Sequence, residues 1–233
     1  MDARNPDVDL LFVGSSTNLL VYDCIKNADV FDQEIDDGVS VLDMCEAGSN
    51  PDVDEPMVIV GGNNSITGID ITGDERFWTI ASGNVTAIQF MDVDGDGDDE
   101  MITCSDDSAV RILKGEDAVF ELAEKAPVVL LTKVTDTTYG YCLKNGSFGV
   151  YEKEQKLWRQ PRSNHDVAAI CGCSTDVFGD GRGLLVVGFS SGVIQVHRGS
   201  DGEMINRIDT IKEPIAQLLF DDFRMMGKKQ VIA

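Results

Sequence analysis

A short hairpin pattern that recurs at a nearly constant interval is the feature that most limits how this chain can fold. In each copy an apolar run leads into a small polar tip and a second apolar run follows, as in residues 10–22. The tips begin at residues 15, 62, 105, 143 and 189, so the intervals are 47, 43, 38 and 46 residues. Asn145-Gly146 and Ser191-Gly192 supply the positive φ that tight turns need. Each copy therefore predicts a β-hairpin.

A second apolar marker recurs in phase with the hairpins. It begins at residues 39, 85, 128, 167 and 215, at intervals of 46, 43, 39 and 48 residues. More polar strand candidates lie between hairpin and marker, as in residues 75–80 and 155–159. One period thus holds about four short strands, which is the content of a propeller blade. We predict an all-β fold, a β-propeller of four-stranded blades.

Two other architectures fit the pattern less well. A helical solenoid would show apolar residues at i, i+3, i+4 and i+7, whereas these segments are short, β-branched and separated by turn residues. An immunoglobulin-type sandwich would not repeat its hairpins in register. In a propeller, large aromatic side chains pack between neighbouring blades, and we predict this role for Phe31, Phe77, Trp78 and Trp158.

The length of the chain sets the number of blades. With a period of about 44 residues, 233 residues hold about five blades, and the sequence stops in the apolar run 230–233 as if inside a strand. We expect residues 1–233 to form a single β-propeller domain or a fragment of one. Either the chain is a segment of a larger ring, such as one of seven blades, or the ring closes with few blades by joining its termini.

The charge balance is strongly acidic. The sequence has 41 Asp and Glu residues against 19 Lys and Arg residues, a formal charge of −22. Such a field repels phosphate backbones and anionic lipid, so nucleic acid is excluded as an expected partner, and basic proteins and divalent cations fit better. No run of 18 to 20 apolar residues is present, and we expect no transmembrane segment.

The cysteines lack the spacing of a zinc site and the density of a disulfide scaffold. Buried, reduced thiols are the expectation for all six: Cys24, Cys45, Cys104, Cys142, Cys171 and Cys173. Cys171 and Cys173 would point to one face of a strand, but no second pair completes four metal ligands.

An acidic loop at residues 92–100 is the strongest candidate for a binding site. Carboxylates occupy loop positions 1, 3, 5, 7 and 9, and a glycine occupies position 6. This spacing places hard oxygen ligands around one Ca²⁺, while strand-like flanks and Thr103 at position 12 distinguish the loop from a helix-flanked EF-hand. It resembles the calcium loops of integrin-type propeller repeats. The predicted ligands are the side chains of Asp92, Asp94, Asp96 and Glu100 and the backbone carbonyl of Asp98.

Two later loops are altered copies of this one. The loop 176–184 keeps positions 1, 5 and 6 but has Phe178 and Leu184 at positions 3 and 9. The loop 222–227 retains the first carboxylate and the glycine. We expect neither copy to hold an ion. One intact site among altered copies indicates that an ion bound there would stabilise the conformation of the loop and perform no chemistry.

Several segments in order resemble one family, the Bardet-Biedl syndrome 2 proteins. The segments cover nearly the whole chain: 11–23, 59–63, 77–79, 92–97, 139–141, 145–151, 158–159, 164–165 and 223–225. The departure is the loop with Phe178 and Leu184, where the family pattern is more polar.

The resemblance implies a seven-bladed propeller in a subunit of the BBSome, a coat-like complex that moves membrane proteins into and out of cilia. It implies a non-catalytic scaffold whose partners are other BBSome subunits, including the related propeller proteins numbered seven and nine, with ciliary membrane-protein cargo bound indirectly. The implied location is the cilium, its basal body, the ciliary membrane as a peripheral protein, and the cytoplasm.

Two other classes of function remain as alternatives. A calcium-dependent adhesion propeller would use the same acidic loop outside the cell. A quinoprotein-type enzyme would need more tryptophan-bearing strands than the two at residues 77–78 and 157–159. The two histidines, His165 and His197, lie on or beside predicted strands without a nucleophile elbow or zinc helix, so we expect no enzyme activity.

Overall fold

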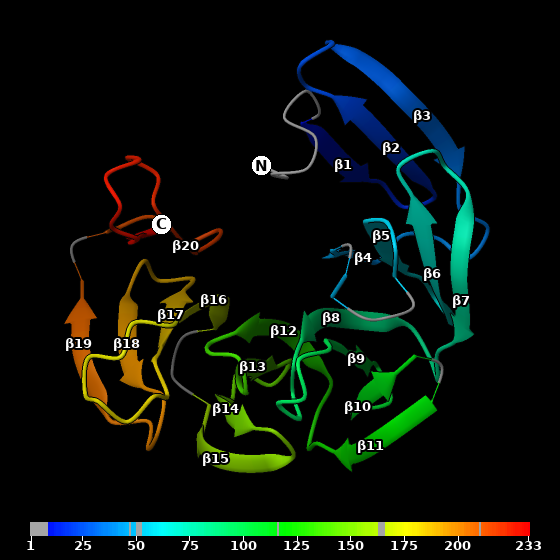
Figure 1. Ribbon diagram of the computed structural model, residues 1–233. Helices are drawn as coiled ribbons and strands as arrows, with labels where there is room; N and C mark the ends of the chain where they lie inside the picture. Colours follow the sequence, from blue (N-terminus) through cyan, green and yellow to red (C-terminus); the bar gives the residue numbers. More distant parts are fainter. Residues whose placement is uncertain (1–8, 47, 50–52, 116, 163–165, 210) are drawn as a thin grey trace. The chain divides into compact units, whose positions relative to one another are not determined.

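The computed structural model describes residues 9–46, 48–49, 53–115, 117–162, 166–209 and 211–233, and these residues contain strands and turns but no helix (Figure 1). The chain divides into two compact units, which are described separately. Unit 1 comprises Met1–Phe90 and Asp98–Leu122, and unit 2 comprises Met91–Gly97 and Ala123–Ala233.

Unit 1 contains one three-stranded sheet and two four-stranded sheets, each with its strands in chain order. The first sheet consists of β1 (Leu10–Gly14), β2 (Asn18–Asp23) and β3 (Ala28–Glu34). The second consists of β4 (Val41–Cys45), β5 (Met57–Gly61), β6 (Ser65–Asp70) and β7 (Glu75–Ile80). The third consists of β8 (Val85–Met91), β9 (Glu100–Ser105), β10 (Ala109–Lys114) and β11 (Asp117–Ala123), of which only the final residues of β8 and β11 belong to unit 2.

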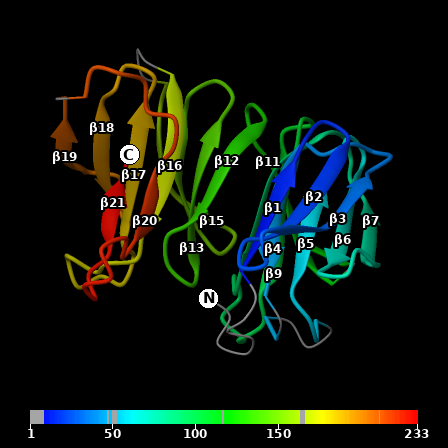
Figure 2. The same cartoon turned by 90° about the horizontal axis from the view of Figure 1, so that it is seen from above.

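Unit 2 contains two four-stranded sheets and a two-stranded one. The first consists of β12 (Val128–Lys133), β13 (Thr138–Leu143), β14 (Phe148–Glu152) and β15 (Gln155–Gln160). The second consists of β16 (Val167–Cys173), β17 (Leu184–Phe189), β18 (Ile194–Arg198) and β19 (Met204–Ile208). The last consists of β20 (Leu219–Asp221) and β21 (Gln230–Ile232), with β20 beside β16 (Figure 2).

The predicted hairpins are confirmed. All five tips fall between antiparallel strands, namely β1 and β2, β5 and β6, β9 and β10, β13 and β14, and β17 and β18. Gly146 and Gly192 both have φ of 82°, and Ser108 takes the same role with φ of 68°. Positive φ therefore lies where the turn chemistry requires it.

Close packing between sheets explains why the two sequence markers share one period. A β-carbon on Gly14, Gly61 or Gly188 would lie only 2.6 Å from a side-chain carbon of Val39, Val85 or Ile215, respectively. Gly14 and Gly61 end the first strand of a hairpin, Gly188 is the last residue but one of such a strand, and each partner begins the following apolar marker. The absence of a side chain at the hairpin thus makes room for the first residue of the following marker.

The core of each unit lies between its sheets. In unit 1, Leu19 and Val21 pack with Val58 and Val60, and a second cluster joins Ile66 to residues of β8–β10. In unit 2, Phe148 and Trp158 pack with residues of β17, and β16 packs with the segment that leads into β20. Buried faces against both neighbours are what a sheet within a propeller requires.

Two sequence predictions were wrong in detail. Trp78 does not pack between sheets: its side chain is 50% exposed, whereas Phe31, Phe77 and Trp158 join the clusters between neighbouring sheets. The fifth marker, residues 215–218, is not a strand, because β21 pairs only with residues from Leu219 onward. Ile215 and Leu218 are nevertheless buried. The apolar pattern of residues 215–218 therefore indicated a segment that packs in the core, although the segment is not a strand.

Candidate functional site: the acidic loop and the charged clusters

The acidic loop between β8 and β9 is held by its own backbone. The Asp92 carboxylate accepts hydrogen bonds from the backbone N–H groups of Gly95 at 2.6 Å, Asp96 at 3.0 Å and Gly97 at 2.9 Å. Gly95 and Gly97 have φ of 84° and 100°, which favours glycine at both positions. The first carboxylate of the motif therefore organises the turn that the following residues make.

Three of the five predicted ligand residues come together. Oxygen atoms of Asp92, Asp94 and Glu100, all from this one continuous loop, lie within 4.8 Å of one another, while Asp96 and Asp98 are not in the group. Glu100 is 2% exposed and begins β9, where Lys114 Nζ lies 3.2 Å from its Oε1. Such a group of carboxylate oxygens has the chemistry of a site for a hard divalent cation.

The two altered loops keep the turn but change the charges. Asp176 accepts from the N–H groups of Gly179 at 2.7 Å and Asp180 at 3.1 Å, as Asp92 does in its loop. The ring centre of Phe178, at the third position, lies 4.2 Å from the guanidinium carbon of Arg198. In the last loop Asp222 likewise accepts from Gly227 N–H. The first carboxylate is therefore a structural element of all three loops, and only the loop 92–100 gathers three carboxylates.

A buried carboxylate that the sequence did not reveal lies in unit 2. Glu124, whose side chain is 1% exposed, accepts a hydrogen bond from Tyr151 Oη and lies 2.5 Å from Lys156 Nζ and 3.4 Å from Arg159 Nη1. Burial acts to raise the pKa of Glu124, but the bonds from Lys156 and Tyr151 outweigh it, so the pKa lies below its ordinary value. Lys156 Nζ also lies 5.2 Å from the ring centre of Tyr151.

No catalytic arrangement emerges among the residues that the structure describes. His197 is 3% exposed and its ring nitrogens contact Gly202 O at 3.0 Å and Gln195 Oε1 at 3.1 Å. Burial lowers the pKa of His197 despite the contact with Gly202. The imidazole therefore has a structural role, and His165 lies outside the described residues.

The six cysteines are free thiols, and five of them are buried, as predicted. The prediction of burial was wrong for Cys24, which is exposed. Burial raises the pKa of Cys142 to about 12, so that thiol stays protonated. Cys171 and Cys173 do share one face of β16, where they pack with Ile194, Ile215 and Leu218. The other described members of this cluster are apolar side chains.

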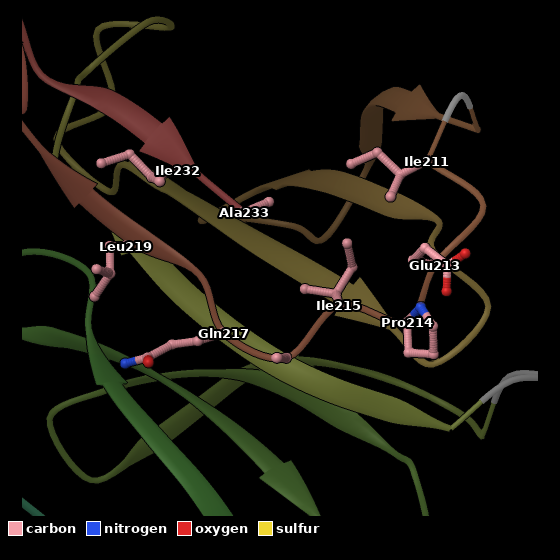
Figure 3. Close-up of a pocket in the computed structure, with 9 residues that line it drawn as sticks. Ile211, Glu213, Pro214, Ile215, Gln217, Leu219, Ile232 and Ala233 are labelled. Carbon is pink, nitrogen blue, oxygen red and sulfur yellow. The ribbon is translucent and has the colours of Figure 1, made fainter.

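An apolar hollow of about 430 Å³ lies near β20 and β21 in unit 2. Figure 3 shows Ile211, Pro214, Ile215 and Ile232 around it. Among the described residues of the lining, Glu213 is the only one with an acidic side chain. The lining is therefore mostly apolar, with Glu213 and Gln217 as its polar side chains among the described residues.

Comparison with known structures shows a β-propeller fold. A chain from the crystal structure of BBS1N in complex with ARL6DN, soaked with lead, matches 91% of this chain and 66% of its own, with a TM-score of 0.71 and 14% identity. The computationally designed Ika8 protein matches 91% of this chain and 63% of its own, with a TM-score of 0.67 and 17% identity. At these identities the likeness concerns the fold alone.

Comparison with known sequences points to one family. The human BBSome complex member BBS2 is 35% identical over 98% of this chain, the Danio rerio protein 35% identical over 96%, and the Caenorhabditis elegans protein bbs-2 29% identical over 89%. The chain spans roughly a third of the length of these relatives, covering 31%, 30% and 28% of them.

Family models agree with these relatives. The N-terminal region of ciliary BBSome complex subunit 2 matches residues 2–45, and the middle region of the same subunit matches residues 87–197. Together the two models match more than half of the chain. With these matches and 35% identity along almost its whole length, the chain belongs to the ciliary BBSome complex subunit 2 family.

Proposed function

We propose that the chain is part of a non-catalytic scaffold subunit of the BBSome that acts in ciliary membrane-protein trafficking. The observation that carries the proposal is the 35% identity to human BBSome complex member BBS2 over 98% of the chain. The fold supports it, because a propeller presents many strand edges and loops for docking and the described residues hold no catalytic arrangement. Family membership does not favour the adhesion or quinoprotein alternatives.

The proposed partners are other BBSome subunits, among them the related propeller proteins seven and nine, with ciliary membrane-protein cargo bound through the assembled complex. We propose the cilium, its basal body, the ciliary membrane surface and the cytoplasm as the places where it acts. Within the described residues no helix is long and apolar enough to cross a membrane.

Affinity capture from ciliated cells tests this proposal. The tagged chain is expected to recover BBSome subunits in amounts well above those recovered by an unrelated propeller of similar charge. Recovery of secreted adhesion partners or of enzymes, with BBSome subunits at background, would contradict it.

We also propose that the loop 92–100 binds one structural Ca²⁺. The supporting observation is the approach of Asp92, Asp94 and Glu100 within 4.8 Å. Millimolar Ca²⁺ is expected to raise the melting temperature of the chain, since an ion that binds only the folded state stabilises it. Asp94→Asn should remove the response, and Asp176→Asn, in the altered loop, should leave it. No response of the wild-type chain in calorimetry or melting would end the calcium proposal and leave the scaffold proposal standing.

A further inference from the structure

The outward side of β7 in unit 1 is an apolar surface on an otherwise polar edge. Trp78 is 50% exposed and Ile80 is 74% exposed, and both lie on the same side of the strand because side chains alternate. Exposed tryptophan is costly to leave in water and is enriched among the residues that dominate protein interfaces. These two side chains form what we call the β7 face.

The backbone of β7 is also open on one edge. β7 pairs with β6, and it ends its sheet, whose order is β4-β5-β6-β7. The N–H and C=O groups that point away from β6 have no strand partner among the residues described. An edge of this kind accepts an added strand from another chain, with main-chain hydrogen bonds giving affinity and side chains giving specificity.

Carboxylates lie at both ends of the β7 face. At its start, Asp74 and Glu75 are exposed. The neighbouring cation Arg76 lies 2.6 Å from the buried carboxylate of Asp70 and 3.9 Å from that of Asp74. At its end, Ile80 pairs with Ser65, whose hydroxyl donates to Asp37 at 2.7 Å, and the exposed Asp36 adjoins Asp37. Burial acts to raise the pKa of Asp37, but the bonds from Asn64 and Ser65 outweigh it, so this carboxylate is charged at neutral pH.

The carboxylates at the two ends of the β7 face indicate which kind of partner can bind there. A second copy of this chain would bring another net charge of −22 against the acidic ends and would be repelled. A segment with an apolar side chain between lysines or arginines would match both the face and its ends. We propose that the β7 face binds an extended basic segment of a partner protein, which adds to the free edge of β7 as a further strand. This inference rests on the proposed scaffold function and names the chemistry of one docking partner.

Peptide binding to the whole chain tests the inference. The probe is a fluorescein-labelled ten-residue peptide of alternating Lys and Ile, followed by anisotropy. Trp78→Ser and Ile80→Ser are each expected to weaken its binding about tenfold or more, as for central interface residues. The matched control is Val119→Ser, since Val119 is 56% exposed on the edge strand β11. Circular dichroism checks that each variant folds.

Two further arms separate strand addition from general attraction to an acidic surface. The same peptide with alternate amides N-methylated should lose binding, because it can no longer donate to the edge of β7. A peptide with Glu in place of Lys should not bind. Equal affinity of wild type, Trp78→Ser and Val119→Ser, or undiminished binding of the N-methylated peptide, would overturn the inference.

Subunit capture distinguishes failure of this inference from failure of the proposed function. If wild type and Trp78→Ser recover BBSome subunits equally and the peptide discriminates between no variants, the β7 face is not a docking site while the scaffold function stands. If wild type recovers no BBSome subunit but the peptide result is as expected, the scaffold function fails and the binding surface stands.

Discussion

Strands β7 and β15 carry similar sequences, Phe77-Trp78 and Leu157-Trp158, yet one tryptophan is exposed and the other buried. In β15, Trp158 pairs with Val150 and its Nε1 donates to Gly199 O at 2.7 Å. In β7, the residue in the corresponding place, opposite Gly68, is Phe77. Trp78 therefore takes the place that Arg159 holds in β15, on the opposite face of the sheet. A one-residue offset in register reverses which side chain is buried.

The residues at this equivalent position, Arg159 in β15 and Trp78 in β7, make different contacts. Arg159 reaches the buried carboxylate of Glu124, together with Lys156. In the part of the chain that the structure describes, Trp78 has no such contact, and its side chain remains half exposed beside the free edge of β7. In the sheet that contains β15, the residue at this position, Arg159, therefore forms an ion pair with Glu124. In the sheet that contains β7, the equivalent Trp78 leaves an apolar side chain exposed to a partner.

The largest effect is expected from truncating the buried tryptophan. Trp158→Ala should lower the free energy of unfolding by about 3–5 kcal/mol, since it removes a buried ring and leaves Gly199 O without its donor. Trp78→Ala should cost within about 0.5 kcal/mol, as is usual for an exposed side chain. Urea unfolding of both variants gives the comparison, and similar losses at the two sites would contradict the difference between β7 and β15.

A smaller effect is expected at the glycine that makes room for Trp158. Gly202 has φ of 74°, and a β-carbon there would lie 2.6 Å from the Trp158 ring. Gly202→Ala should cost about 1–3 kcal/mol more than Gly179→Ala, because overlap with a rigid ring forces the core to shift. Gly179 has φ of 73° with nothing within 4 Å of its added carbon, so it carries the same backbone strain without the overlap.

The smallest effect is expected from the charged network beside β15. Glu124→Gln should cost about 1–2 kcal/mol at pH 7, because Lys156 and Arg159 lose a buried charged acceptor. The folded pKa of Glu124 is depressed, so its contribution is complete above the ordinary value of 4.5 and is lost as the pH falls through the folded value. Wild type and Glu124→Gln should thus converge in stability on acidification. The exposed Glu154→Gln, as control, should match wild type throughout.

The sequence predicted the repeating sheets because hairpin tips and apolar markers are local signals. It could not predict that the side chain of Trp78 is exposed, because that depends on a bulge in β7. There Phe77 pairs with Gly68 and Glu75 pairs with Ile69, so the register passes over Arg76. Such bulges leave little trace in composition. Phe77 and Trp158 hold equivalent positions in their two sheets. This equivalence is visible only when the paired residues are counted outward from the turn between the last two strands of each sheet.

The candidate sites divide in the same way. The carboxylates of Asp92, Asp94 and Glu100 were found because their spacing lies within one loop. The Glu124 network was missed because Tyr151 and Arg159 lie 27 and 35 residues away in sequence. Spacing along the chain cannot show contacts that depend on which side of a strand each partner occupies.

Tryptophan fluorescence of two single-tryptophan variants is the most direct test of the register. With Trp78→Phe, the remaining Trp158 should emit at short wavelength and resist quenching by acrylamide. With Trp158→Phe, the remaining Trp78 should emit at long wavelength and be quenched readily. Equal quenching in the two variants, or a protected Trp78, would contradict the arrangement of β7 and β15 described above.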